Sequence, residues 1–333
     1  MRDCIHAPVP NLSYIHLTED EIDEMIDVMA CSRGSLPLER RMTREEAMIY
    51  TFRDPDFDPK ATWLVSSDGK PVGFGAGAVD SNRLSAGKND GRFEMDVIPD
   101  FRGLGIENEL LTRSLGYFRS KGLDAALSRV PIEDKWKISF LESNDFTEYY
   151  RIFDLVRSGT EDIGSPTLPE GFVLQHGLFA EHSDAEIESW VEAFNDSFMD
   201  HVNFAPEMPQ RFINWRNWAG DPMLLSTIRK DSSIVGVCLC EESSLYNKER
   251  GRKVGWINIV GVVPQFRRLG LARAMLADGI SWLVGRGMDT LYIGVVSENE
   301  KALDLYLSLG FKKEHESMWM KRPVVLESAV KDS

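Results

Sequence analysis

Residues 262–275 read VVPQFRRLGLARAM and residues 97–110 read VIPDFRGLGIENEL, so one pattern occurs twice, 165 positions apart. The match runs without gaps to Phe311 and Phe146, with 13 identities in 50 positions. A period of this length indicates a whole domain rather than one unit of a solenoid. The sequence therefore predicts two copies of one fold, whose chemical residues can be compared position by position.

Length and composition fit this division. Of the 333 residues 43% are hydrophobic, enough for two domains that each bury a core. Neither a signal peptide nor the roughly 18 apolar residues of a membrane span is present, so we expect a cytoplasmic protein that binds no membrane. A formal net charge of -15 disfavours nucleic acid as a partner.

The cysteines show no metal-binding spacing. We expect them to be small core residues in a reducing compartment, and we expect no metal. They are Cys4, Cys31, Cys238 and Cys240.

The two copies share one order of elements. Two helices and a hairpin precede each repeat, and the repeat itself is typical of strand, tight turn, helix, strand, helix and strand. The segment SGTEDIGSPTLPEG at 158–171 is the expected linker. We predict an α/β fold with an α+β mixed sheet in two tandem domains, 1–160 and 168–333, each a twisted sheet flanked by helices. The segment 243–255 is expected to be a hairpin loop or a flap.

In the second copy a strand leads into a turn at the N-terminus of a helix. Unpaired N–H groups and the helix dipole make such a turn suitable for a diphosphate. Gly270 and Ala272 leave the backbone accessible to a ligand, and Arg267, Arg268 and Arg273 place positive charge around it.

Known phosphate-binding loops differ from this turn. The chain has no GxxxxGK[ST] motif and no three-glycine Rossmann fingerprint. The order Arg267-x-x-Gly270-x-Ala272, then Asn299, Tyr306 and Gly310-Phe311, resembles the GNAT acyltransferase superfamily. The tandem arrangement resembles the two-domain type represented by mycothiol synthase. The resemblance is close in the second copy and weaker in the first.

This resemblance implies acetyl-CoA as acyl donor and Tyr306 as general acid. A phenol with a pKa near 10 can protonate a departing thiolate whose conjugate pKa is about 8.5. Tyr306 could instead be a core residue of its helix, and Asn299 a helix cap. The donor-binding residues implied by the resemblance are Val262, Val263, Arg267, Arg268, Leu269, Gly270, Leu271, Ala272, Arg273, Asn299, Ala302 and Tyr306.

The first copy departs from this pattern at each chemical position. Glu107 stands where the second copy has Ala272, and its carboxylate would repel a diphosphate. Asp134 replaces Asn299, Lys137 replaces Ala302 and Leu141 replaces Tyr306. We expect the first domain to be catalytically inactive and to support the second, although it could bind a different ligand.

The second copy lacks the glutamate that many members of the superfamily use as general base. Trp256 occupies that position, and we expect Trp256, Asn258 and Val260 to share one face of a strand, where Asn258 could position a water. Candidate bases are Glu241, Glu242 and His201, each of which could instead be structural.

Aromatic residues are dense on the expected acceptor side. They favour a small amine with apolar character, or a peptide N-terminus, as acceptor. They are Phe198, Phe204, Trp215, Trp218 and Trp256.

We therefore expect an acetyl-CoA-dependent N-acetyltransferase whose active site lies in the second domain and acts on an amine of a small molecule or peptide. One alternative is a non-enzymatic acyl-CoA-binding or regulatory protein. Another is an aminoacyltransferase that uses charged tRNA as donor.

Overall fold

A computed structural model describes residues 11–325, except 162, 165, 166, 202 and 219. Its strands are β1 Leu12–Ile15, β2 Thr62–Ser67, β3 Lys70–Ala78, β4 Asp90–Val97, β5 Ala125–Pro131, β6 Thr147–Ser158, β7 Phe172–Leu178, β8 Met223–Lys230, β9 Ser233–Glu242, β10 Val254–Val262, β11 Thr290–Val296 and β12 Lys312–Pro323. Its α-helices are α1 Ile22–Arg33, α2 Arg44–Tyr50, α3 Ser81–Ser85, α4 Ile106–Ser120, α5 Lys135–Glu142, α6 Asp184–Phe198, α7 Pro209–Trp218, α8 Ser244–Arg250, α9 Leu271–Gly285 and α10 Glu300–Ser308.

The repeat seen in the sequence is reproduced in the secondary structure. Helices α4 and α9, strands β5 and β11, and strands β6 and β12 have the same bounds after a shift of 165 residues. We call β1–β6 with their helices the N-terminal half, and β7–β12 with theirs the C-terminal half. The expected linker begins where β6 ends, at Ser158.

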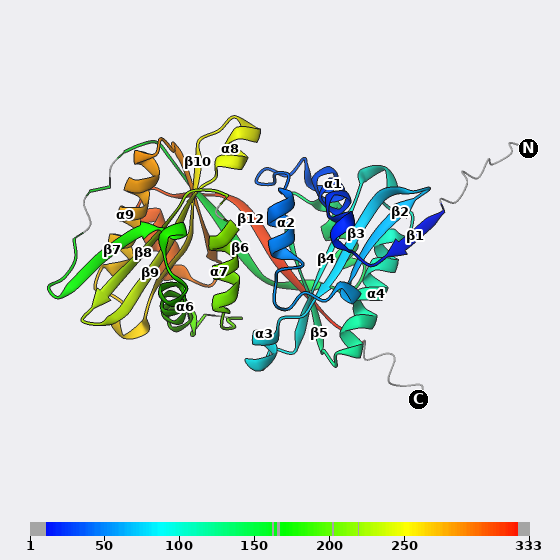
Figure 1. The fold of residues 1–333 in the computed structure, drawn as a ribbon, viewed down its shortest axis with the longest axis horizontal. Coiled ribbons are helices and arrows are strands. Elements are labelled where there is room, and N and C mark those ends of the chain that lie inside the picture. The colour runs from blue at the N-terminus through cyan, green and yellow to red at the C-terminus, as the bar shows by residue number, and fades with distance from the viewer. Residues whose placement is uncertain (1–10, 162, 165–166, 202, 219, 326–333) are drawn as a thin grey trace, which may run out of the picture.

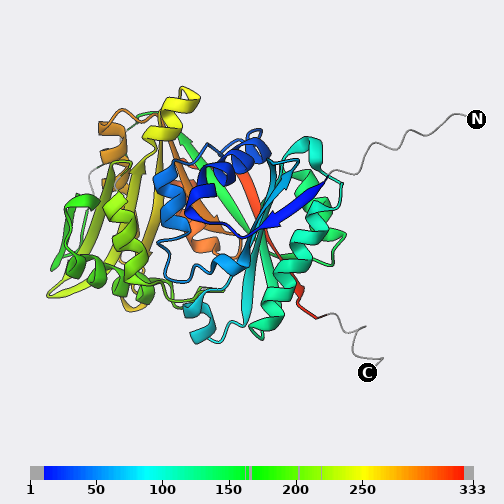
Figure 2. The ribbon, with the colours of Figure 1, turned by 45° about the vertical axis from the view of Figure 1, so that its right-hand side comes forward.

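All twelve strands form one mixed sheet in the order β1-β2-β3-β4-β5-β12-β6-β11-β10-β9-β8-β7. The last strand of each half pairs with the other half: β6 is antiparallel to β11, and β12 is antiparallel to β5. The two exchanged strands also pair with each other along nearly their whole length. Figures 1 and 2 show β6 in green and β12 in red crossing between the two halves.

Because of this exchange, each hydrophobic core contains residues from the other half. Met318 and Met320 of β12 are buried with α4 in the N-terminal half. Leu155 of β6 is buried with α9 in the C-terminal half. The sequence pattern predicted the strands correctly but assigned each to its own domain's sheet, because a strand's partner is not written in its own residues.

Helices cover both faces of the sheet, and alternation along β9 shows how. Cys238 and Cys240 pack against α9 on one face, whereas Val237 and Leu239 pack against α6 and α7 on the other. In the N-terminal half, α4 covers one face and α1 and α2 the other.

Two expectations need correction. Residues 243–255 contain helix α8, with Gly251 in the left-handed conformation at its C-terminus, rather than only a loop. Cys238 and Cys240 are buried core thiols as expected, but Cys31 is exposed because it lies on the outer side of α1. Cys4 lies outside the described residues.

Within the described part of the chain, no helix has both the length and the apolar character needed to cross a bilayer.

An ion-pair cluster also joins the halves. The guanidinium of Arg211 in α7 contacts Asp54 (3.1 Å), Asp56 (2.9 Å) and Asp80 (2.9 Å) of the N-terminal half. The side chains are mostly buried, so water screens them little. Arg211 holds together three carboxylates that would otherwise repel one another.

We expect Arg211→Met to lower the free energy of unfolding by about 2–3 kcal/mol, because it leaves three partly buried carboxylates without their cation. Urea denaturation checks this. The control Arg53→Met removes an exposed ion pair with Glu45 and should cost less than about 1 kcal/mol. Equal losses in the two variants would show that the cluster does not stabilise the fold.

Candidate active site

The candidate site is built around a gap between β10 and β11. These parallel strands are paired only from Val254↔Thr290 to Ile257↔Ile293. A β-bulge in β10 between Ile257 and Ile259 interrupts its register with β9. The bulge bends β10 where its pairing with β11 ends, and the separated strands leave main-chain groups available. In the N-terminal half β4 and β5 also separate, after pairing only from Asp90↔Ala125 to Arg92↔Leu127, but no register shift interrupts β4 against β3.

One cavity of about 480 Å³ lies at this gap, between the strands and the N-termini of α9 and α10. The structure brings most of the predicted donor residues together there. The lining includes Asn258, Val262, Arg267, Arg268, Gly270, Leu271, Ala272, Arg273, Asn299, Ala302 and Tyr306. Of the other two predicted residues, Val263 is buried behind the turn and Leu269 is exposed; neither lines this cavity.

The turn before α9 leaves its backbone open to a ligand. Gly270, the N-cap residue, has φ 79°, and a Cβ placed on it would meet no atom within 4 Å. No side chain caps α9 at this residue, so the first N–H groups of the helix face the cavity. Arg268 also has positive φ, 69°, a conformation that is strained for a residue with a Cβ.

Arg267 braces the turn from behind. Its Nε donates to the Val262 carbonyl (3.0 Å), and its terminal nitrogens bond to the Ser197 carbonyl (2.9 Å) and the Asp200 carboxylate (2.8 Å). Arg102 of the N-terminal half bonds in the same way to Val97 and Ser32. The guanidinium of Arg267 therefore has its own partners, and the exposed side chain of Arg268 is the freer positive charge beside the turn.

Tyr306 and Asn299 combine structural and site positions. Tyr306 is 5% exposed, packs against Phe311 in the core and also lines the cavity. Burial raises the pKa of its phenol, with a smaller contribution from Cys238. Its hydroxyl therefore keeps its proton at neutral pH. The Asn299 side chain caps α10 by accepting a hydrogen bond from the Ala302 N–H (3.2 Å).

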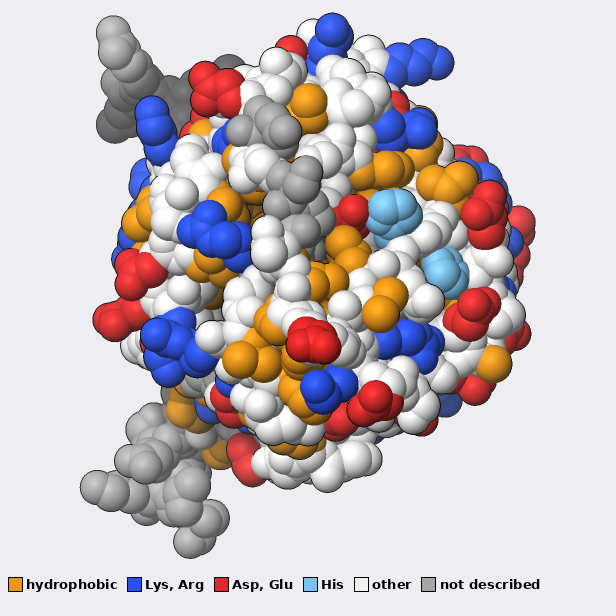
Figure 3. Space-filling view, turned by 90° about the vertical axis from the view of Figure 1, so that its left-hand side faces the viewer, with side chains coloured by type: hydrophobic (Ala, Val, Ile, Leu, Met, Phe, Trp, Pro, Cys, Tyr) orange, Lys and Arg blue, Asp and Glu red, His pale blue; other side chains and the backbone are white. Residues whose placement is uncertain are grey.

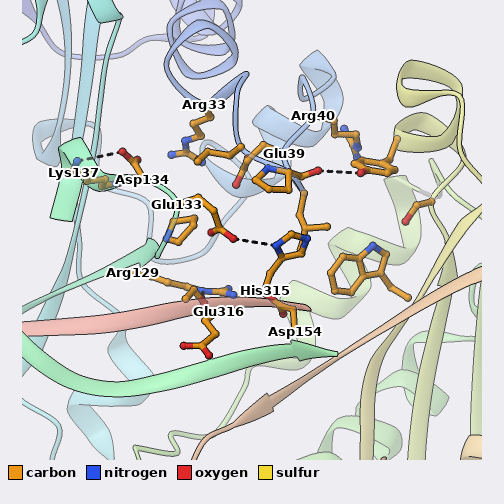
Figure 4. Close-up of a pocket in the computed structure, with 18 of the residues that line it drawn as sticks. Arg33, Glu39, Arg40, Arg129, Glu133, Asp134, Lys137, Asp154, His315 and Glu316 are labelled. Atoms are coloured by element: carbon orange, nitrogen blue, oxygen red, sulfur yellow. Dashed lines mark hydrogen bonds and ion pairs between the residues drawn. The ribbon is translucent and has the colours of Figure 1, made fainter. Parts of the chain in front are cut away.

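A second cavity, of about 500 Å³, lies between the two halves. Figure 4 shows the charged side chains that converge on it from both halves. Trp256 and Glu241 belong to its lining, and Asn258 lines both this cavity and the first. The two cavities therefore adjoin at the bulge.

Glu241 differs from the other candidate bases in its surroundings. It faces Trp256 across the β9–β10 pair, and its Oε2 accepts a hydrogen bond from Asn258 Nδ2 (2.8 Å). Burial raises the pKa of Glu241 to about 7, while this hydrogen bond acts in the opposite direction. A carboxyl group of this kind can exchange a proton near neutral pH.

The other two candidates lie elsewhere. The Glu242 carboxylate is bound to Arg286 (2.6 Å). His201 packs edge-on against Phe198 (ring centroids 4.8 Å apart) and lines the first cavity, and burial lowers its pKa.

The bulge corrects one prediction about β10. Trp256 stacks on Tyr292 with ring centroids 4.9 Å apart, on the face of the second cavity, whereas Val260 packs toward α9 on the other face. Strict alternation would have placed Trp256 and Val260 on the same face, but the one extra residue at the bulge puts them on opposite faces. Of the other aromatic residues, Phe198 and Trp215 line a further cavity beside α6 and α7 with Asn258, whereas Phe204 and Trp218 line none of these three cavities.

In the N-terminal half the equivalent turn is closed by its own side chain. Glu107 is buried, and its Oε1 accepts a hydrogen bond from the Gly103 N–H at 2.7 Å. Gly105 has φ 93°, so the turn has the same shape as that before α9. The carboxylate thus occupies the place where the open turn would receive an anion.

The other substituted positions of this half are also filled. Lys137 is buried 3.8 Å from the Glu94 carboxylate, Leu141 lies in the core, and Asp134 caps α5. These residues complete a folded half, and Asp134 and Lys137 also line the cavity between the two halves.

Sequence reasoning missed residues that the exchanged strands and β5 supply. Asp154 of β6, His315 of β12 and Arg129 of β5 all line the cavity between the halves. Asp154 faces Gly294 of β11 across the sheet, although 140 residues separate them in the chain. No spacing in the sequence signals such a contact.

Comparisons with known proteins agree with this geometry. The model of the acetyltransferase (GNAT) family matches residues 28–146 and 187–311, most of the chain. A mycothiol acetyltransferase of Thermobispora bispora is 28% identical over 227 residues, covering 66% of this chain and 72% of that protein. A mycothiol acetyltransferase of Salinispora tropica is 26% identical over 297 residues, covering 87% of this chain and 90% of that protein.

A solved tandem GNAT protein from the clavulanic acid biosynthesis pathway superposes with a TM-score of 0.73 at 14% identity, over 95% of this chain and all of that one. This likeness concerns the fold, which is the same tandem arrangement. The chain therefore belongs to the acetyltransferase (GNAT) family and is a tandem N-acetyltransferase similar to the mycothiol acetyltransferases.

Proposed function

We propose that the C-terminal half transfers an acetyl group from acetyl-CoA to an amine of a small molecule or peptide. The observation that carries the proposal is the gap between β10 and β11. The cavity at this gap contains an open anion-binding turn and a buried tyrosine, and the second cavity contains a titratable carboxylate. The two cavities adjoin at Asn258. Donor and acceptor can thus approach from adjoining cavities that meet at Asn258.

The residues beside α9 fit the donor. The uncapped helix N-terminus, the unobstructed Gly270 and the exposed Arg268 suit its diphosphate. The separated strands leave main-chain groups that can pair with an extended amide-containing arm. Bound acetyl-CoA would supply the activated acyl group, and the chain's residues would position it and handle the protons.

Tyr306 is the proposed general acid. Because burial raises its pKa, the phenol is protonated at neutral pH and can donate a hydrogen bond or a proton to the departing thiolate. Glu241 is the proposed general base, acting directly or through a water held by Asn258. With a pKa of about 7 it is partly ionised at neutral pH and can accept the proton of an attacking amine.

The N-terminal half has a supporting role in this proposal. Its turn is occupied by Glu107, and its exchanged strand β6 completes the sheet of the active half. It also forms one wall of the acceptor cavity through β4, β5 and the segment after α1.

We expect Tyr306→Phe to lower kcat about a hundredfold, because the thiolate loses its proton donor, while the dissociation constant for acetyl-CoA stays nearly unchanged. Steady-state kinetics and calorimetry measure the two quantities. Tyr117→Phe, which removes a phenol bonded to Asp58 in the other half, is the control and should retain full activity. An unchanged kcat in Tyr306→Phe would remove this residue from the mechanism.

For the wild type, kcat/KM should rise as the pH increases through about 7, because Glu241 must lose its proton before it can accept one. Glu241→Gln should abolish this rise and leave only the one due to the acceptor amine. Measuring kcat/KM against pH for both proteins shows whether the rise is lost in the variant. Glu242→Gln, the adjacent carboxylate paired with Arg286, should keep the wild-type profile; the same profile in Glu241→Gln would refute the assignment.

A further inference from the structure

The cavity between the halves is lined by many charged side chains. On the outer end of the C-terminal half, acidic and basic side chains are interspersed where water screens them (Figure 3). Inside the cavity, an unpaired charge is more costly. The charged lining residues are Arg33, Glu39, Arg40, Glu94, Asp96, Arg129, Glu133, Asp134, Lys137, Asp154, Glu241, His315 and Glu316.

Most of these charges have partners. Arg33 forms two hydrogen bonds with Asp96 (2.9 and 2.6 Å), and Lys137 faces Glu94. The remaining contacts are Arg40 with Glu46, Glu133 with His315, and Glu316 with Arg151, while Asp134 caps α5. Glu39 is a partly exposed loop residue, and Glu241 is bonded to Asn258.

Asp154 is a carboxylate left without a partner. It is only 8% exposed, and among the described residues no hydrogen bond or ion pair reaches its oxygens. Burial raises its pKa, and Arg129 and His315 act on it only at longer range. Figure 4 shows its side chain near His315, beside the sheet that floors the cavity.

Arg129, an exposed side chain of β5 that also lines the cavity, is the complementary cation. Its Nε donates to the Ser317 hydroxyl (3.0 Å), but within the described residues no carboxylate lies within 4 Å of its guanidinium. Ser317 lies two residues along β12 from His315, the partner of Asp154 in the pairing with β6. The hydroxyl that holds Arg129 and the strand position opposite Asp154 are therefore roughly 7 Å apart along β12.

We propose that Asp154 and Arg129 bind the two charges of an α-amino acid, the carboxylate of Asp154 receiving the ammonium group and the guanidinium of Arg129 the carboxylate. An α-amino acid carries both groups on one carbon, so one molecule can contact a carboxylate and a guanidinium that line the same cavity. This inference rests on the proposed function and names the acceptor class of the same site.

The position of Asp154 relative to the gap supports this class. Its Oδ1 lies 3.6 Å from where a Cβ on Gly294 would stand, and Gly294 is the first residue of β11 beyond the pairing with β10. An ammonium group held there lies beside the opening to the donor cavity. Glu241 approaches from the other side, through β9 and β10. The α-amine is therefore placed for acetylation.

The test compares each common L-amino acid with the amine and the amide that lack its carboxylate. Acetyl transfer from acetyl-CoA and binding by saturation-transfer NMR without acetyl-CoA are both measured. We expect at least one amino acid to be preferred about ten- to a hundredfold over its amine and amide. Equal rates and equal binding for the three compounds, across the whole panel, would overturn the inference.

Single variants test the roles of the two charged side chains one at a time. Arg129→Gln should raise KM for the preferred amino acid ten- to a hundredfold and leave the matched amine unaffected, whereas Asp154→Asn should weaken both. Arg113→Gln removes the same charge from α4, where Arg113 is paired with Glu109 and lines neither cavity, and should change neither. Equal losses for acid and amine in Arg129→Gln would also overturn the inference. Absence of transfer to every compound would refute the proposed function, and the NMR preference would then decide the inference by itself.

Discussion

The structure depends on the hydrogen bonding of two exchanged strands. β6 and β12 pair with each other at the centre of the sheet, and each satisfies the backbone groups of an edge strand in the opposite half. Neither half could be separated without exposing unpaired strand edges and part of the other's core. Because of this constraint, a duplicated domain has become a single twelve-stranded sheet, with a cavity where its two copies meet.

The same constraint explains why the copies could diverge. A half whose fold is stabilised by its partner can lose its ligand-binding chemistry and still be needed for packing. Glu107 illustrates this: its carboxylate satisfies the Gly103 N–H, so the closed turn is a stable local structure rather than a damaged site. In the other half, Ala272 leaves the equivalent groups to a ligand.

Local patterns predicted most elements and the two turns, because these depend on periodicity and on short loops. The gathering of residues from Val262 to Tyr306 was implied by the resemblance to the GNAT superfamily. Local patterns could not predict the bulge at Asn258, which depends on pairing with β9, and they placed Val260 on the wrong face for that reason. Nor could they predict Asp154 beside Gly294, since strand exchange leaves no mark in either segment. Sequence reasoning therefore named Glu241, Trp256 and Asn258 of the second cavity but missed the residues that the N-terminal half and the exchanged strands supply to it.

The central claim is that one half of this protein binds the acyl donor and the other is closed by its own carboxylate. Calorimetric titration with acetyl-CoA, read for the number of sites per chain, tests it most directly. We predict one site in the wild type and none in Ala272→Glu, which introduces into the C-terminal half the carboxylate that closes the turn of the N-terminal half. Two sites in the wild type would contradict the claim, and so would a single site that survives Ala272→Glu.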